Sequence, residues 1–273
     1  MSGGSEVDEA EMSRIIAVSN EKGGVAKTTS VISLGAALAE LDRHILIIDL
    51  DPQANLTLSL GLEPGEAQFS TTHILLEGAS MQGTDISTDF KNLSIIPADT
   101  RMVTAEYFLP MRKDYATILR RAIRAGDMGK YDYVLLDCPP ALGAITLNAL
   151  SAAHLLVIPT QAEYFSAYAL RNMMNLVRQV RRDGNPGLSY RILVTMLDCK
   201  NDSHRNIHNQ LRNTFGDGVL TTVIEMDTKL RESPIAGLPI TVYRTATRGA
   251  VQYRVLAQEL VEHAKEFEFR QPA

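Results

Sequence analysis

Residues 21–29 read EKGGVAKTT, and this stretch predicts the fold of the chain. It follows the apolar run of residues 15–18 and precedes the small-residue amphipathic run of residues 31–41, so it lies where a buried strand turns into a helix. A helix N-terminus offers unpaired backbone N–H groups and a partial positive charge, and glycines let the backbone curl around a polyphosphate. We therefore expect this loop to bind phosphate, with Lys27 against the β- and γ-phosphates and the Thr28 hydroxyl on Mg²⁺.

The loop departs from the strict P-loop pattern G-x-x-x-x-G-K-[ST] at both outer glycines, where the chain has Glu21 and Ala26. It resembles instead the deviant Walker A box, K-G-G-x-G-K-[ST]-[ST], of the ParA/MinD family of dimerising ATPases, in which an extra lysine, here Lys22, precedes the glycine pair. Alanine fits at position 26 if φ is negative there and costs about 1–2 kcal/mol if the loop needs a positive φ. A plain glycine turn with two solvated lysines would leave the Lys-Thr pair at the helix start unexplained.

The composition suits one large α/β domain. The chain has 273 residues, of which 45% are hydrophobic and 22% charged, and its longest apolar runs are far too short to span a bilayer. We expect a disordered acidic tail over residues 1–13, a single domain over residues 14–273 and a cytoplasmic location. Cys138 and Cys199 are far apart and lack metal-ligand spacing, so both are predicted to be buried, reduced thiols.

Strand-like and helix-like segments alternate along the chain, which predicts a doubly wound, mostly parallel sheet flanked by helices. The expected strands cover residues 15–18, 43–51, 93–97, 133–137, 155–159, 190–196 and 220–224. The expected helices cover residues 31–41, 71–77, 102–125 with a break at Pro110, 144–153, 167–182, 203–215 and 249–267.

Carboxylates follow two of these strands. Asp49 and Asp51 end one apolar run, and Asp137 ends another. A nucleoside triphosphate with Mg²⁺ needs a hydroxyl ligand, carboxylates near the metal and a group that orients the attacking water. We expect Thr28, Asp49 and Asp137 at the metal. A single aspartate at a strand end is commonly a turn former or helix cap, so the prediction depends on their convergence.

The resemblance runs from about residue 14 into the C-terminal helix and is nearest the ParA/Soj branch of the family. Residues 49–55 match the switch I sequence D-x-D-P-Q-x-N, and residues 136–140, 146–149, 159–164 and 192–198 also look like that branch. The resemblance implies a P-loop NTPase fold of the deviant Walker A type. It implies three catalytic residues: Asp51, which positions or activates water, Lys27, and Lys22, which crosses to the nucleotide of a second subunit. The implied nucleotide-binding residues are Lys22, Gly23, Gly24, Val25, Ala26, Lys27, Thr28, Thr29, Asn148, Thr195, Asp198 and Ile224.

The charge of the chain is unevenly distributed. The overall net charge is −5, but residues 1–163 are acidic and residues 164–273 carry a net charge of about +4. Lys200, Arg205, Lys229, Arg231 and Arg248 are therefore candidates for contacts with DNA phosphates. Relatives usually have I-P-R where this chain has Ile224-Glu225-Met226, so one basic position is lost. A solvated surface with uneven charge explains the counts equally well.

The sequence favours a ParA-type ATPase that dimerises on ATP and Mg²⁺, binds double-stranded DNA without sequence preference in the nucleoid, and is released when a ParB-like or cargo-adaptor protein stimulates hydrolysis. Hydrolysis is expected to be slow without partner and DNA. A MinD-like membrane-cycling ATPase is the first alternative, but it needs a basic amphipathic C-terminal helix, and residues 255–269 are rich in glutamate. An iron–sulfur carrier would need cysteine ligands in a motif that is missing here. An ATP-dependent ligase would turn over a small substrate without DNA.

Overall fold

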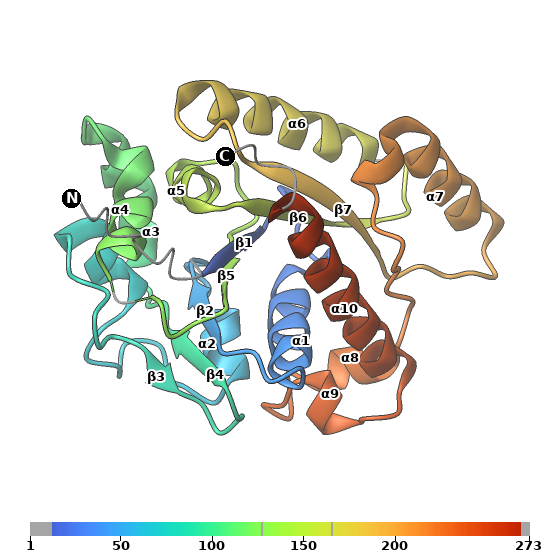
Figure 1. Ribbon diagram of the computed structural model, residues 1–273, viewed down its shortest axis with the longest axis horizontal. Coiled ribbons are helices and arrows are strands. Elements are labelled where there is room, and N and C mark those ends of the chain that lie inside the picture. The colour runs from blue at the N-terminus through green and yellow to red at the C-terminus, as the bar shows by residue number, and fades with distance from the viewer. Residues whose placement is uncertain (1–12, 127, 165, 269–273) are drawn as a thin grey trace, which may run out of the picture.

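A seven-stranded sheet in the order β3-β4-β2-β5-β1-β6-β7 forms the centre of the molecule (Figure 1). The computed structural model describes residues 13–126, 128–164 and 166–268, with side chains described as far as residue 264. The strands are β1 (Arg14–Val18), β2 (Ile45–Asp49), β3 (Ile86–Ser87), β4 (Leu93–Ile96), β5 (Tyr133–Asp137), β6 (Leu155–Gln161) and β7 (Ser189–Thr195). All neighbours pair in parallel except β3 with β4, which confirms the predicted mostly parallel sheet.

Helices cover both faces of this sheet (Figure 1). They are α1 (Lys27–Ala39), α2 (Asn55–Ser59), α3 (Met102–Phe108), α4 (Ile118–Ala125), α5 (Ala144–Ala152), α6 (Ser166–Asp183), α7 (Asp202–Phe215), α8 (Thr228–Glu232), α9 (Ile240–Tyr243) and α10 (Arg248–Glu268). Single turns of other helix types lie at His73–Glu77, Leu109–Met111, Tyr115–Thr117 and Gly216–Gly218. Helices α1 and α10 pack side by side on one face, and α3 to α7 line the other.

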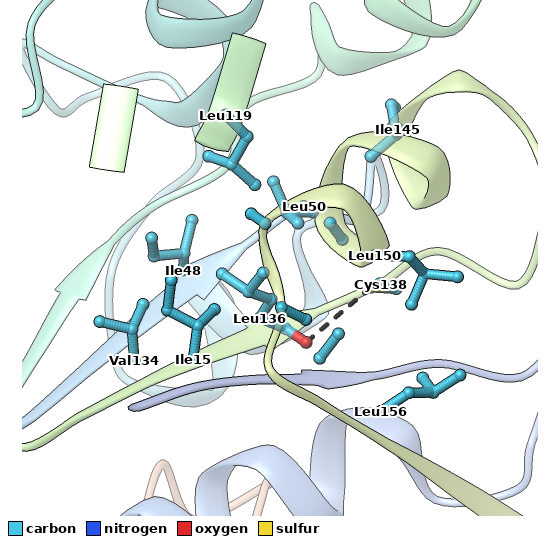
Figure 2. Packing of buried hydrophobic residues seen from close by; sticks show 14 of the residues in the cluster. Ile15, Ile48, Leu50, Leu119, Val134, Leu136, Cys138, Ile145, Leu150 and Leu156 are labelled. Carbon is cyan, nitrogen blue, oxygen red and sulfur yellow. Dashed lines mark hydrogen bonds between the residues drawn. The ribbon is translucent and has the colours of Figure 1, made fainter. Parts of the chain in front are cut away.

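Alternate residues of the central strands enter two different cores. In β1, Ile15 and Ala17 join the cluster with α3 to α7, whereas Ile16 and Val18 join the cluster with α1 and α10. Figure 2 shows the first cluster, with residues of β1, β2 and β5 facing α5. A continuous apolar strand is what a parallel sheet buried on both faces requires. Gly35 lets α1 approach closely, because a Cβ there would lie 2.9 Å from the Ile47 side chain.

The expected strand at residues 220–224 is wrong. Isolated parallel bridges flank the segment, at Ile192↔Val219 before it and Leu197↔Glu225 after it. Its ladder is interrupted because the Glu259 carboxylate of α10 accepts the backbone N–H groups of Thr221 at 2.7 Å and Thr222 at 2.9 Å. A side chain thereby satisfies donors that a regular strand would direct to a neighbour.

Other boundaries differ slightly from expectation. Residues 71–77 are helical as expected, with a π-helical turn over His73–Glu77, whereas the two-residue edge strand β3 was not predicted. The predicted break at Pro110 is confirmed, since α3 ends at Phe108 and a 3-10 turn follows. Residues 1–12 of the expected tail lie outside the described residues. Ser13 is buried, and its hydroxyl donates to the Met128 carbonyl at 2.6 Å.

The parallel register gathers the functional candidates at one edge of the sheet. Asp137, the last residue of β5, lies in register with Val18 of β1 on one side and with Asp49 of β2 on the other. The chain leaves β1 directly into the phosphate loop, so the loop and the two aspartates meet at the carboxyl ends of three adjacent strands. In the part of the chain that the structure describes, no helix is both long and apolar enough to cross a membrane.

Candidate active site

The phosphate loop joins the end of β1 to the start of α1 and presents its backbone openly. Gly23 and Gly24 are exposed, and a Cβ at either position would have no atom within 4 Å. Ala26 is the N-cap of α1, and no side chain caps the helix there. The first N–H groups of a helix have no partner within the helix, so this end of α1 can donate to an anion.

Ala26 adopts the left-handed conformation, with φ of +68°. The loop therefore has a positive φ at position 26, which is the unfavourable case for alanine. A non-glycine residue in this region costs about 1–2 kcal/mol, because its Cβ crowds the backbone carbonyl. Gly24, which has φ of +72°, carries no such cost. The loop thus stores strain at the one position where this chain departs from the glycine of the family pattern.

Buried polar groups below the loop hold it in shape. Asn20 donates to the Pro159 carbonyl at 2.8 Å and accepts the backbone N–H of Lys22 at 3.0 Å. Thr195, at the end of β7, donates to the Val25 carbonyl at 3.1 Å and is fully buried. Thr195 was predicted at the nucleotide site, and the structure places it against the loop. The role of Asn20 was missed, although a polar residue directly after an apolar strand was the available signal.

Lys27 is buried at the base of the loop and is 7% exposed. Its Nζ donates to the Lys22 carbonyl at 3.0 Å, across the loop. Burial lowers the pKa of the Lys27 ammonium, while the nearby carboxylates of Asp137 and Asp51 act in the opposite direction. Lys27 is thus a cation held between a backbone cradle and two acids, which suits it to a polyphosphate.

Asp137 is the least satisfied group of the site. It is completely buried, and neither carboxylate oxygen has a hydrogen-bond partner of good geometry. Burial first and the neighbouring Asp49 charge second raise the pKa of Asp137 well above its usual range, whereas the nearby Thr28 hydroxyl and Lys27 ammonium oppose the shift. An orphaned buried carboxylate is costly unless it holds a cation or a cation-bound water. The donor set of Asp137 and Thr28 therefore fits Mg²⁺.

No group of three or more His, Cys, Asp and Glu side chains is poised to bind a metal within the described residues. Mg²⁺ retains several waters and is held by one or two protein oxygens together with substrate phosphates.

Asp49, predicted near the metal, accepts three hydrogen bonds at the end of β2. Its carboxylate accepts the Thr57 hydroxyl at 2.7 Å, the Thr57 backbone N–H at 3.0 Å and the Asp51 backbone N–H at 3.0 Å. Burial raises the pKa of Asp49 to about 6 despite these hydrogen bonds. Both oxygens thus accept hydrogen bonds that position α2 and the backbone of Asp51, and the place of Asp49 near the metal stays a prediction. Thr57 was missed, since its contact depends on the turn between β2 and α2.

Asp51 lies at the start of this turn and is 6% exposed. One carboxylate oxygen accepts the Gln53 backbone N–H at 2.9 Å, which fixes the side chain in an Asx turn. The carboxylate also acts on the charge of Lys27, so it lies on the same side of the sheet edge as the phosphate loop. The structure thus brings Asp51 to the predicted site.

Lys22 is held by its own chain. Its Nζ donates to the Glu163 carboxylate at 2.5 Å and to the Gln161 side chain at 3.0 Å. Gln161 also reaches the Gly24 carbonyl at 3.3 Å. The end of β6 therefore orients the loop lysine in the isolated subunit. Neither partner of Lys22 was predicted, because both lie more than a hundred residues away in the sequence.

Asn148 does not belong to the phosphate loop. It is fully buried, accepts the Leu119 backbone N–H at 3.2 Å and donates to the Ala144 carbonyl at 3.0 Å, so its amide connects α4 with α5. Asp198 accepts the Lys200 backbone N–H at 2.9 Å in a turn after β7. Ile224 is buried beside that turn, with its N–H on the Val194 carbonyl at 2.9 Å. The last two lie past the end of β7, close to Thr195.

The predicted DNA-contacting residues all follow β7 in the chain, and acids accompany three of them. Arg205 pairs with Asp202, Lys229 with Glu232 at 2.7 Å and Arg248 with Glu225 at 2.8 Å. Lys200 and Arg231 are exposed. We call the five basic residues the basic face; they are Lys200, Arg205, Lys229, Arg231 and Arg248.

Known proteins resemble this chain over almost its whole length. The AAA domain family matches residues 13–190. The sporulation initiation inhibitor protein Soj of Bacillus subtilis is 38% identical over 91% of this chain and 98% of its own. The chromosome partitioning protein ParA of Caulobacter vibrioides is 34% identical over 93% of this chain and 96% of its own. The chain belongs to the ParA/MinD family of P-loop ATPases. Within that family it is nearest the ParA partition branch.

A solved structure supports the ParA/MinD fold independently. The crystal structure of cobyrinic acid a,c-diamide synthase from Mycobacterium smegmatis with bound ADP and magnesium has a TM-score of 0.81 and 34% identity, covering 93% of this chain and 96% of that one. Cys138 is buried as predicted, but Cys199 is exposed, so the prediction of two buried thiols is wrong for Cys199.

Proposed function

We propose that the protein is a ParA-type ATPase that dimerises on ATP, binds DNA without sequence preference and leaves it when a partner stimulates hydrolysis. The observation that carries the proposal is the orphaned, buried Asp137 carboxylate beside Lys27 at the mouth of an open phosphate loop. Such a carboxylate destabilises the empty protein and is explained by a cation that arrives with the nucleotide.

Different residues of the loop bind different parts of ATP. Backbone N–H groups from Gly23 to Thr29 receive the phosphates at the start of α1, and Lys27 neutralises the charge of the β- and γ-phosphates. Thr28 and Asp137 hold Mg²⁺, which when bound neutralises the charge that develops on the phosphates. Thr195, Asp198 and Ile224 lie beyond the loop, where the nucleoside would extend.

Hydrolysis needs a positioned water and a cation at the γ-phosphate. Asp51 is fixed by the Gln53 backbone and by Asp49, so it can orient the attacking water. Lys22 reaches the nucleotide of a second subunit in the proposed dimer, which places a cation where γ-phosphate charge develops. That movement requires Lys22 to leave Glu163 and Gln161 of its own chain, so hydrolysis is slow in the single subunit.

The packing of the C-terminal helix favours DNA rather than a membrane as the surface to which the ATPase binds. Tyr253, Leu256 and Leu260 of α10 are buried against α1, and the Tyr253 hydroxyl lies 2.9 Å from that of Ser30. The apolar face of α10 is therefore used inside the subunit, whereas a membrane-binding helix must keep that face free. The name of the relative ParA, a chromosome partitioning protein, also favours partition. In this proposal a ParB-like or cargo-adaptor protein is the activator and the nucleoid is the location.

The first experiment sediments the wild-type protein and the Asp51→Ala variant with random-sequence DNA or with anionic vesicles, each with and without ATP. ATP should drive wild-type protein onto DNA and not onto vesicles, and this binding should fall steeply with salt. Asp51→Ala should hydrolyse ATP at least about 100-fold more slowly, as expected for loss of a positioned catalytic group, yet accumulate on DNA with ATP.

Two results would reject this function, and a third would reject only the role of Asp51. Binding to vesicles without DNA would indicate a MinD-like cycle. Normal hydrolysis by Asp51→Ala would remove Asp51 from the chemistry. Turnover of a small carboxylic acid with ammonia or glutamine, independent of DNA, would indicate a ligase, a class suggested by the name of the Mycobacterium smegmatis neighbour.

A further inference from the structure

Glu225 occupies a fixed place among the residues of the basic face. Its backbone pairs with Leu197 just beyond β7, and its N–H donates to the Gln252 side chain at 2.9 Å. One carboxylate oxygen accepts Gln252 Nε2 at 3.0 Å, and the other accepts Arg248 at 2.8 Å. Backbone and side chain are thus both clamped to the first turns of α10.

The other two acids that pair with the basic face are more exposed than Glu225. Asp202 and Glu232 each pair with a base three residues away, and Glu232 also accepts the Tyr243 hydroxyl at 3.0 Å, but both pairs are well exposed. Such pairs are screened by solvent and rearrange at little cost. Glu225, in contrast, is only 23% exposed, while its partner Arg248 is 60% exposed. The acid is the fixed member of this pair and the base is the mobile one.

Glu225 also lies next to the turn that carries Lys200. Partial burial raises the pKa of the Cys199 thiol, the Glu225 carboxylate raises it further, and Arg248 opposes the shift, which places all three groups close together. A DNA phosphate that approaches Arg248 or Lys200 therefore meets a carboxylate that cannot move away. The carboxylate and the phosphate are both negative, so their repulsion weakens binding, and the repulsion is strongest where solvent access is reduced.

We propose that Glu225 lowers the affinity of the basic face for DNA by holding Arg248 away from phosphate. The inference rests on the proposed DNA binding. Arg248 then contributes little to binding in the wild-type protein, since its charge is already neutralised. Removal of the carboxylate charge frees Arg248 for a phosphate of double-stranded DNA.

The test measures ATP-dependent binding to random-sequence DNA across a range of salt concentrations for the wild type, Glu225→Gln, Arg248→Ala and the double variant. Glutamine keeps an oxygen for Gln252, so the fold is preserved, which thermal unfolding checks. Glu225→Gln should bind about 3- to 10-fold more tightly near 100 mM salt, with a salt slope steeper by about 0.9 for each additional phosphate contact. In the double variant, the added Arg248→Ala substitution should abolish this gain in affinity. Glu232→Gln makes the same charge change on an exposed pair and is the matched control.

The outcomes separate this inference from the proposed function. If neither the wild type nor Glu225→Gln binds DNA, both are rejected. If the wild type binds and Glu225→Gln binds equally or more weakly, only the inference is rejected. An equal gain for Glu225→Gln and Glu232→Gln would show a net-charge effect and would also reject it, as would a gain that persists when Arg248 is alanine.

Discussion

The sheet edge that carries the phosphate loop and the basic face beyond β7 are both rich in charge, yet they are built in opposite ways. At the sheet edge Asp49, Asp137 and Lys27 are at most 7% exposed. On the basic face the side chains of Arg205 and Arg248 are 51% and 60% exposed. The buried edge leaves one carboxylate without a partner, whereas three of the five basic-face residues already have an acidic partner.

The difference shows where a charge can be interpreted as function. A buried charge without a partner is costly, so its persistence indicates a ligand. An exposed ion pair contributes little to stability and can exchange its partner for a phosphate or for solvent. Substitutions at the buried edge should therefore change stability and chemistry together. Substitutions on the basic face should change only DNA binding.

The largest expected effect is at Asp137. Asp137→Asn should abolish ATP hydrolysis, a loss of at least about 100-fold, and should stabilise the nucleotide-free protein by about 2 kcal/mol at pH 8, because an unpartnered buried charge is removed. In the unfolded chain this carboxyl has a pKa near 3.8, and folding raises it. The wild type then loses stability as pH rises from the unfolded to the folded pKa, so the benefit of Asn should vanish below about pH 4. Urea unfolding at several pH values checks this.

Asp99→Asn is the matched control, since Asp99 is also buried but has partners. Although burial raises the pKa of Asp99, hydrogen bonds from Arg101, Ser70 and Thr72 hold it at about 2. Its stabilisation is present above the unfolded pKa and is lost as pH falls through about 2. Asp99→Asn should therefore destabilise by about 2 kcal/mol at neutral pH. The comparison breaks down if both variants shift stability in the same direction at pH 8.

The sequence predicted the buried edge well because its geometry is set by local rules. Parallel strands end at one edge, so Asp51, Asp137 and the loop had to converge once the strands were identified. The contacts that were not predicted there depend on turns: Thr57 donates to Asp49 only because α2 folds back under β2. Asn148 was assigned to the nucleotide by resemblance, and its buried amide instead connects two helices.

The basic face was predicted less well because ion pairs join residues that sequence does not place together. Arg248 meets Glu225 across 23 residues, and Arg254 meets Glu40 across 214. A count of charges in the C-terminal part could not reveal that acids neutralise part of that surface. The segment at residues 220–224 failed for a similar reason, since a distant glutamate takes its backbone donors.

A smaller effect is expected at Ala26, within the buried edge. Ala26→Gly should raise the free energy of unfolding by about 1 kcal/mol, because glycine adopts φ of +68° without strain. Gly24→Ala should lower the free energy of unfolding, because its φ is +72°. No neighbouring atom would crowd the new Cβ, so this loss would come from backbone strain alone. Urea unfolding of the nucleotide-free protein measures both. Unchanged stability in Ala26→Gly would show that the loop relaxes in solution and stores no strain.

The smallest effect on stability is expected at Arg205, and it sharpens the contrast with Arg254. Arg205 pairs with exposed Asp202 and donates to the Cys199 carbonyl at 2.9 Å, so Arg205→Ala should change stability by less than about 0.5 kcal/mol. If Arg205 contacts phosphate, the salt slope of DNA binding should fall by about 1. Arg254 ties α10 to Glu40 at 2.5 Å and to the Thr241 and Thr245 carbonyls. Arg254→Ala should cost about 1–2 kcal/mol and leave the slope unchanged. If instead Arg254→Ala lowered the salt slope and Arg205→Ala left it unchanged, DNA would contact α10 beside Arg254 rather than the N-terminal turn of α7.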